Sequence, residues 1–187
     1  MDQFSYLSVL LSIVLGLGIA NLLTGFARVI QLRSRVVFYS PVLMWAFTLV
    51  LLHIQTWWMM FAMQQVHVWT FAKFALVLMQ PVLLFFLSAL IWPDFDRDDE
   101  LDLRANYFAQ KNWFFGMMIA IVVFSVLRTV ALTGEMQHPL DFTFHLLFVV
   151  SSAGGVLLRS EIYHKAMAAM TALLFMAYIA LLFADLH

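Results

Sequence analysis

Ionisable and polar side chains inside apolar stretches are the residues of this sequence best suited to chemistry. Such groups are costly in a bilayer, so they usually face the interior of a bundle, where they pair or serve a pathway. Asp141 and His145 are four residues apart, which places them one above the other on a helix face. The whole set is His53, Lys73, Gln80, Arg128, Asp141 and His145.

Two interpretations of this set are open. In the first, Arg128 or Lys73 forms an interfacial salt bridge with Asp141 that holds helix ends together. In the second, the side chains converge on a polar pocket that takes a solute, an ion or a proton. Pro81 interrupts the hydrogen bonding of its helix beside Gln80, so a bend is expected next to that pocket.

Histidine is a common metal ligand, and His53 and His145 are predicted at similar depths on two helices. They are the candidates for a metal site or for axial ligands of haem, although no motif with fixed ligand spacing is present. The chain has no cysteine, which excludes thiolate ligands. Motifs of known enzyme classes are also absent, so we predict no catalytic residue and no cofactor.

The elements that position these groups follow from the composition. Of the 187 residues, 64% are hydrophobic and 11% are charged, against roughly 25% charged in a typical soluble domain. So few charged side chains cannot cover a water-soluble surface, and we expect the lipid bilayer to surround most of the chain. A net charge of −1 leaves no basic field to attract nucleic acid.

Six stretches are long and apolar enough to span a bilayer as helices, which need about 20 residues. They are residues 4–27, 37–60, 70–92, 113–132, 139–158 and 163–183. The sequence therefore predicts an all-α integral membrane protein, a six-transmembrane-helix bundle that forms one domain over residues 1–187. Because most connections are short, consecutive helices are expected to be antiparallel neighbours.

Basic residues predict the orientation of this bundle. Eight of the ten lie on one side: Arg28, Arg33, Arg35, Arg97, Arg104, Lys111, Arg159 and Lys165. The positive-inside rule makes that side cytoplasmic. Both termini are therefore expected on the outer, periplasmic side of a bacterial inner membrane.

The longest connection, residues 93–112, is acidic and is predicted to be a cytoplasmic loop. Within it, an interfacial helix is expected to lie on the membrane through its apolar residues, Leu101, Leu103, Tyr107 and Phe108.

Small residues recur at every fourth position of the first span, which places them in one stripe: Ser8, Ser12, Gly16, Ala20 and Thr24. Helix backbones approach closely at such stripes. The stripe predicts either helix packing inside one bundle or a seam between copies. The run from Ser151 to Gly155 predicts a second close-packing surface.

These features predict a small inner-membrane protein that binds or moves a small solute or ion through an outward-facing polar pocket, in the manner of a channel or transporter. A homo-oligomer is expected, because one copy is small for a complete pathway. One alternative is a non-catalytic accessory or sensor subunit that binds another membrane protein. A second alternative is a membrane redox protein that carries haem or a quinone.

Overall fold

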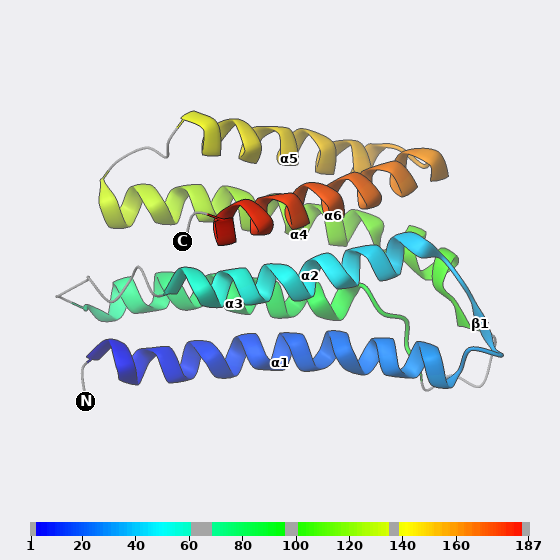
Figure 1. The fold of residues 1–187 in the computed structure, drawn as a ribbon, viewed down its shortest axis with the longest axis horizontal. Coiled ribbons are helices and arrows are strands. Elements are labelled where there is room, and N and C mark those ends of the chain that lie inside the picture. Colours follow the sequence, from blue (N-terminus) through cyan, green and yellow to red (C-terminus); the bar gives the residue numbers. More distant parts are fainter. Residues whose placement is uncertain (1–2, 61–68, 96–100, 135–138, 185–187) are drawn as a thin grey trace.

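The computed structural model describes residues 3–60, 69–95, 101–134 and 139–184, and over these residues the chain is a bundle of helices (Figure 1). The side chains of residues 3, 133, 139–141, 178 and 181–184 are outside this description. The helices are α1 Gln3–Gln31, α2 Ser40–Met59, α3 Phe71–Leu90, α4 Leu103–Thr133, α5 Pro139–Leu157 and α6 Glu161–Ala184. The strands are β1 Val36–Val37 and β2 Leu101–Asp102.

Consecutive helices run in alternating directions, so the start of α1 and the end of α6 lie at the same end of the bundle (Figure 1). We call this the terminal end. The opposite end carries β1, β2 and the connection between α5 and α6, and we call it the strand end. The predicted all-helical fold with six helices is confirmed over the described residues.

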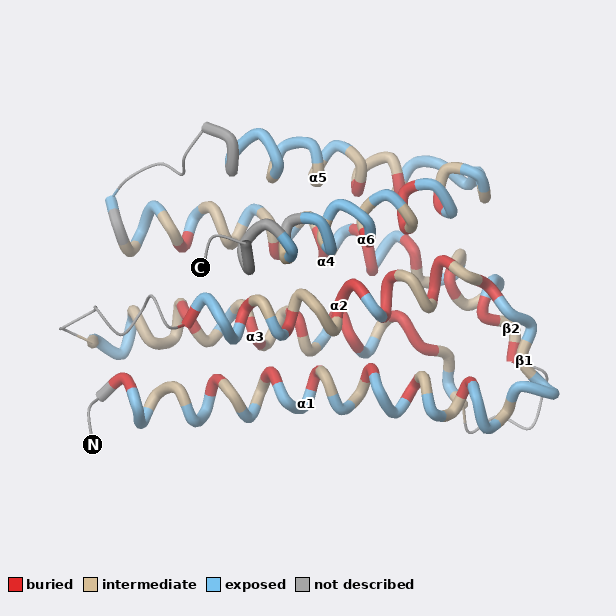
Figure 2. The backbone as a smooth tube through the Cα atoms, in the orientation of Figure 1, coloured by how far each residue is buried: buried red, intermediate tan, exposed pale blue. Residues whose placement is uncertain are grey.

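Four of the helices are long and apolar enough to cross a membrane: Phe4–Gln31, Ser40–Met59, Phe71–Leu90 and Leu103–Leu132. α5 contains a shorter apolar stretch, Phe142–Leu157. Exposed positions follow the outer sides of the helices, while buried positions lie between them (Figure 2). Many of the exposed side chains are large and apolar, among them Phe71 and Trp113. This arrangement fits a helical membrane bundle.

The helices do not all pack on their neighbours in sequence. α4 packs on α3 and α5, as expected, but α1 packs more extensively on α3 than on α2, and the consecutive helices α2 and α3 touch much less. α6, however, makes its main contact with α2 and touches α5 only slightly. It buries Met167 and Ala168, and the small alanine side chain permits a close helix approach.

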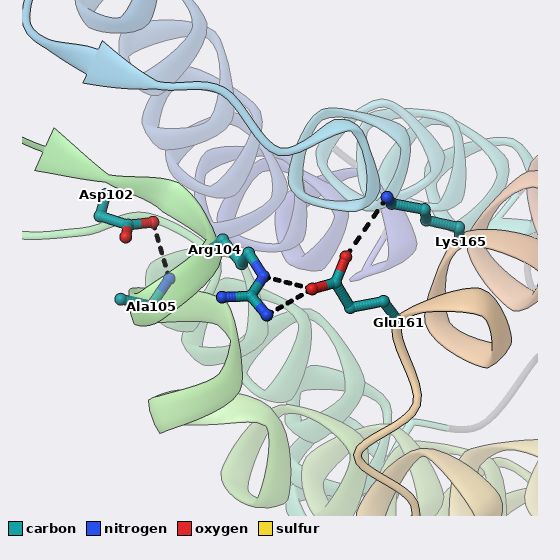
Figure 3. A network of polar contacts seen from close by, with 5 residues as sticks. All are labelled: Asp102, Arg104, Ala105, Glu161 and Lys165. Carbon is teal, nitrogen blue, oxygen red and sulfur yellow. Dashed lines mark hydrogen bonds and ion pairs between the residues drawn. The ribbon is translucent and has the colours of Figure 1, made fainter.

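Local signals set the ends of several helices. The Thr70 hydroxyl accepts a hydrogen bond from the Lys73 amide at 3.3 Å and caps α3. The Asp102 carboxylate accepts one from the Ala105 amide at 2.9 Å and caps α4 (Figure 3). Gly134 ends α4 with a φ of 73°, a left-handed conformation that glycine adopts without strain.

The loop predicted at residues 93–112 is too long. α4 begins at Leu103 rather than at residue 113, so residues 103–112 belong to that helix. Leu101, Leu103 and Tyr107, expected on the membrane surface, are instead core residues that are 5%, 0% and 4% exposed. The parallel pairing of Val36 with Leu101 joins this connection to the one between α1 and α2. Because β2 directly precedes Leu103, this pairing holds the start of α4 beside the connection between α1 and α2. Residues 96–100 of the predicted loop lie outside the described residues.

Candidate functional site

His53, on α2, is the most completely buried of the predicted pocket residues whose side chains the structure describes, with 0% of its surface exposed. Its Nδ1 lies 2.7 Å from the Leu49 carbonyl oxygen. Because a carbonyl oxygen only accepts, Nδ1 carries the proton and donates it. Nε2 has no hydrogen-bond partner among the described residues and faces Gly18 of α1, where a built Cβ would lie 2.3 Å away. His53 therefore lies in a tight helix-packing contact.

Arg128 lies in the last turns of α4, toward the terminal end, and is only 8% exposed. Among the described residues its guanidinium has no hydrogen bond and no ion pair. Burying a charge without a partner costs on the order of several kcal/mol in lost hydration. The Arg128 guanidinium therefore needs a counter-charge. The predicted partner, Asp141, belongs to α5, but its side chain lies outside the described residues.

The other predicted pocket residues are partly buried. Lys73 lies in the first turn of α3 and His145 in the second turn of α5, and each has an interaction partner. Gln80 has its Oε1 buried without a hydrogen bond among the described residues, beside the buried Pro81 inside α3. Their convergence on Arg128 stays a prediction.

No group of three or more histidine, cysteine, aspartate or glutamate residues is placed to hold a metal ion within the described part of the chain. The free nitrogen of His53 faces the backbone at Gly18 rather than an open site. For His53 to bind a metal or haem together with His145, its ring would first have to leave this contact.

The small-residue stripe of α1 faces away from the rest of the chain over most of its length. Gly16, Ala20 and Thr24 are exposed, and a Cβ built on Gly16 would meet no atom within 4 Å. Ser8 is half-buried, and the Ser12 hydroxyl accepts a hydrogen bond from the Trp57 indole at 3.2 Å. The inward face of α1 instead carries Leu11, Leu15, Gly18, Leu22 and Gly25. Gly16, Ala20 and Thr24 therefore do not pack on the described part of the same chain. A seam between copies stays a prediction.

A polar cluster that the sequence analysis did not predict lies toward the strand end. Lys111 of α4 is 4% exposed and donates hydrogen bonds from Nζ to the Gly155 carbonyl oxygen at 3.2 Å and to that of Val156. A third bond, of 3.0 Å, reaches Asn112 Oδ1. A positive charge beside the last carbonyl groups of a helix is favourable. Lys111 thus fastens α4 to the end of α5.

His164 of α6 is fully buried beside this contact. Its Nε2 lies 3.1 Å from the Leu158 carbonyl oxygen and must donate to it. In the neutral ring, Nδ1 then accepts a hydrogen bond from the Tyr107 hydroxyl at 2.9 Å. The rings of Phe108, Phe115 and Tyr163 surround the imidazole. His164 therefore joins α4 to the connection between α5 and α6.

The predicted close-packing run in α5 contacts this cluster. The Tyr163 hydroxyl donates a hydrogen bond to the Ser151 carbonyl oxygen at 2.7 Å. The Tyr163 side chain packs against Gly154, where a built Cβ would lie 2.2 Å from the hydroxyl oxygen. A Cβ on Gly155 would lie 2.7 Å from the Phe115 ring. Both glycines therefore admit aromatic rings that any larger residue would displace.

An ion-pair network lies at the surface of the same end (Figure 3). The Glu161 carboxylate accepts a hydrogen bond from Arg104 Nε at 2.6 Å and pairs with Lys165 at 3.3 Å. The Arg104 guanidinium holds the pKa of Glu161 below its ordinary value, so this carboxylate is ionised at neutral pH. Lys165 also lies 5.8 Å from the centre of the Tyr39 ring. Burial raises the pKa of the Tyr39 hydroxyl, which stays neutral.

One signal for Lys111 is present in the sequence, because it follows Leu103 and Tyr107 at intervals of four, the spacing of a single helix face. No comparable pattern marks His164. Comparison of the chain with known protein families, curated proteins and solved structures finds no match.

Proposed function

We propose that this chain is a six-span protein of a bacterial inner membrane, with both termini outside, that binds or moves a small solute or ion through an outward-facing polar pocket. The long apolar helices support its place in a membrane. The basic side chains Arg28, Arg33, Arg104 and Arg159, all toward the strand end, support the orientation.

The buried guanidinium of Arg128 is the observation that carries this proposal. Charged groups within membrane spans typically face a cavity or pathway and meet an opposite charge there. No described carboxylate pairs with Arg128, and the counter-charge in this proposal is Asp141 or a bound anion. A permanently charged donor at this position favours an anionic solute.

Flux through liposomes tests the proposal. Arg128→Gln and Asp141→Asn are expected to lower the flux of a transported probe by roughly tenfold or more, the effect of losing one charged hydrogen bond. The probes are chloride, inorganic phosphate and potassium, each measured in liposomes that hold equal amounts of protein. Arg33→Gln, an exposed arginine at the strand end, is the matched control and should keep the flux of the native chain.

Stability measurements separate this pocket from a structural salt bridge. If Arg128→Gln and Asp141→Asn keep both the flux and the melting temperature of the native protein, the pocket proposal is wrong. If they lower the melting temperature while the flux per folded protein is unchanged, the two residues form a salt bridge that only holds helix ends together.

A second candidate function is that of an accessory subunit, and the exposed stripe of α1 favours it. Gly16 has open space where a side chain would stand, and Ala20 and Thr24 are exposed beside it. Another helix could approach this backbone closely and gain packing contacts. The partner would be a second copy of this chain or a different membrane protein.

Substitution on the stripe tests this candidate and identifies the partner. Gly16→Leu with Ala20→Leu should weaken association by roughly tenfold or more, because large side chains overpack a close helix contact. Leu17→Ala, at a 55% exposed position of the same helix, is the control. Mass measurement of the purified complex distinguishes a homo-oligomer from a stoichiometric foreign partner. Unchanged mass in the leucine variant would exclude the stripe as the interface.

A further inference from the structure

The corner formed by the end of α5, residues 158–160 and the start of α6 carries unusually exposed apolar side chains. Leu157 is 79% exposed and Ile162 is 81% exposed, and Leu158 between them is 44% exposed. Side chains of this size are unfavourable in water at about 25 cal/mol per Å². Their exposure on both sides of a helix connection indicates that the corner meets lipid.

The depth of this corner along the bundle agrees with a membrane interface. Lys111 contacts Gly155 and Val156, which fixes the level of α4 that lies beside the last turn of α5. Trp113 is only about 3 Å further along α4 and is 71% exposed. Tryptophan is enriched at the level of lipid headgroups. The end of α5 therefore lies at the headgroup level.

Arg159 lies in the middle of this corner and is exposed. No described residue forms an ion pair or a hydrogen bond with its guanidinium. Glu161, the acidic residue two positions on, is already engaged by Arg104 and Lys165 (Figure 3). The corner therefore presents a positive charge that its own carboxylate does not neutralise.

The backbone that carries Arg159 is held in place on both sides. On the α5 side, Lys111 binds the Gly155 and Val156 carbonyl oxygens. On the α6 side, His164 Nε2 donates to the Leu158 carbonyl oxygen at 3.1 Å. A positioned side chain loses less conformational entropy on binding than one on a mobile loop.

We propose that this corner binds the phosphate of an anionic phospholipid, such as phosphatidylglycerol, through Arg159. Guanidinium groups match phosphate oxygens with paired hydrogen bonds. Leu157 and Ile162, on either side, contact the upper part of the acyl chains. These flanking apolar side chains fit a lipid, because acyl chains would cover them, whereas a free phosphate ion would leave them exposed to water.

Titration of the purified protein with phosphatidylglycerol, followed by native mass spectrometry, tests this site. Arg159→Gln is expected to weaken binding by about fivefold, the contribution of one basic residue near an anionic surface. Arg159→Lys, which keeps the charge, should retain most of the affinity. Arg33→Gln is the matched control, because Arg33 is an exposed arginine in another connection of the same end. Phosphatidylcholine is the lipid control.

Each outcome decides the proposal. A loss in Arg159→Gln that is absent in Arg33→Gln and in phosphatidylcholine supports it. Equal losses in the two glutamine variants would show a diffuse basic field and overturn it. Unchanged binding in Arg159→Gln also overturns it. Displacement of the lipid by millimolar inorganic phosphate would mean that the site recognises a free anion, which contradicts the assignment to lipid.

Discussion

Gly18→Ala is expected to destabilise the protein by about 1–3 kcal/mol, although alanine normally favours a helix. The added Cβ would lie 2.3 Å from Nε2 and 2.8 Å from Cδ2 of His53, closer than such atoms approach in proteins. The ring cannot move aside easily, because it is fully buried and its Nδ1 is held by the Leu49 carbonyl oxygen. Thermal unfolding of the purified protein measures the loss.

Gly116→Ala is the matched control, at an exposed position inside α4. A Cβ there meets nothing within 4 Å, so stability should be unchanged or should rise by up to about 1 kcal/mol. The double variant Gly18→Ala with His53→Ala should be no less stable than His53→Ala alone, because the second change removes the clash. Equal melting temperatures of the two glycine variants would contradict the packing contact.

The sequence predicts most of the helices closely, because an apolar stretch of about 20 residues is a strong signal for a long apolar helix. The spans predicted at 37–60, 70–92 and 139–158 match α2, α3 and α5 to within a few residues at each end. The helix count and the alternating directions also agree with the structure. These properties depend on average hydropathy over about 20 residues and not on any single contact.

The start of α4 could not be predicted in this way. Arg104, Gln110, Lys111 and Asn112 lower the hydropathy of its first turns, so the segment resembles a loop when only its average is considered. Leu103 and Tyr107 recur with helical spacing and are buried. Lys111, the buried one of these polar residues, is held inside by tertiary partners, the α5 carbonyl groups that it contacts.

The candidate site is less predictable, because hydropathy fixes the depth of a residue and not the rotation of its helix. Gly16 and Gly18 are both small and apolar, yet one is exposed and the other contacts His53. The depth of Arg128 follows from the sequence. The burial of its side chain without a described partner depends on the rotation of α4 about its own axis, which hydropathy does not fix.

Lys111→Met is expected to lower the free energy of unfolding by about 2 kcal/mol, within the range for hydrogen bonds from a charged donor. Methionine fills a similar volume but cannot donate to the Gly155 and Val156 carbonyl oxygens or to Asn112. The end of α5 would then lose its main polar link to α4. Hydrogen exchange should accelerate at the amides of residues 154–157, and thermal unfolding should report the loss of stability.

Lys165→Met is the matched control, because Lys165 lies at the same end of the bundle but is exposed, and among the described residues it pairs with Glu161 and lies over the Tyr39 ring. Solvent screens that pair, so the loss of stability should be much smaller and exchange at 154–157 should not change. If the two methionine variants lose stability equally, or if α5 exchanges no faster in Lys111→Met, then Lys111 does not fasten α4 to α5. A selective effect would show that a buried lysine holds the corner that presents Arg159, so Lys111→Met should also weaken phosphatidylglycerol binding without altering the guanidinium itself.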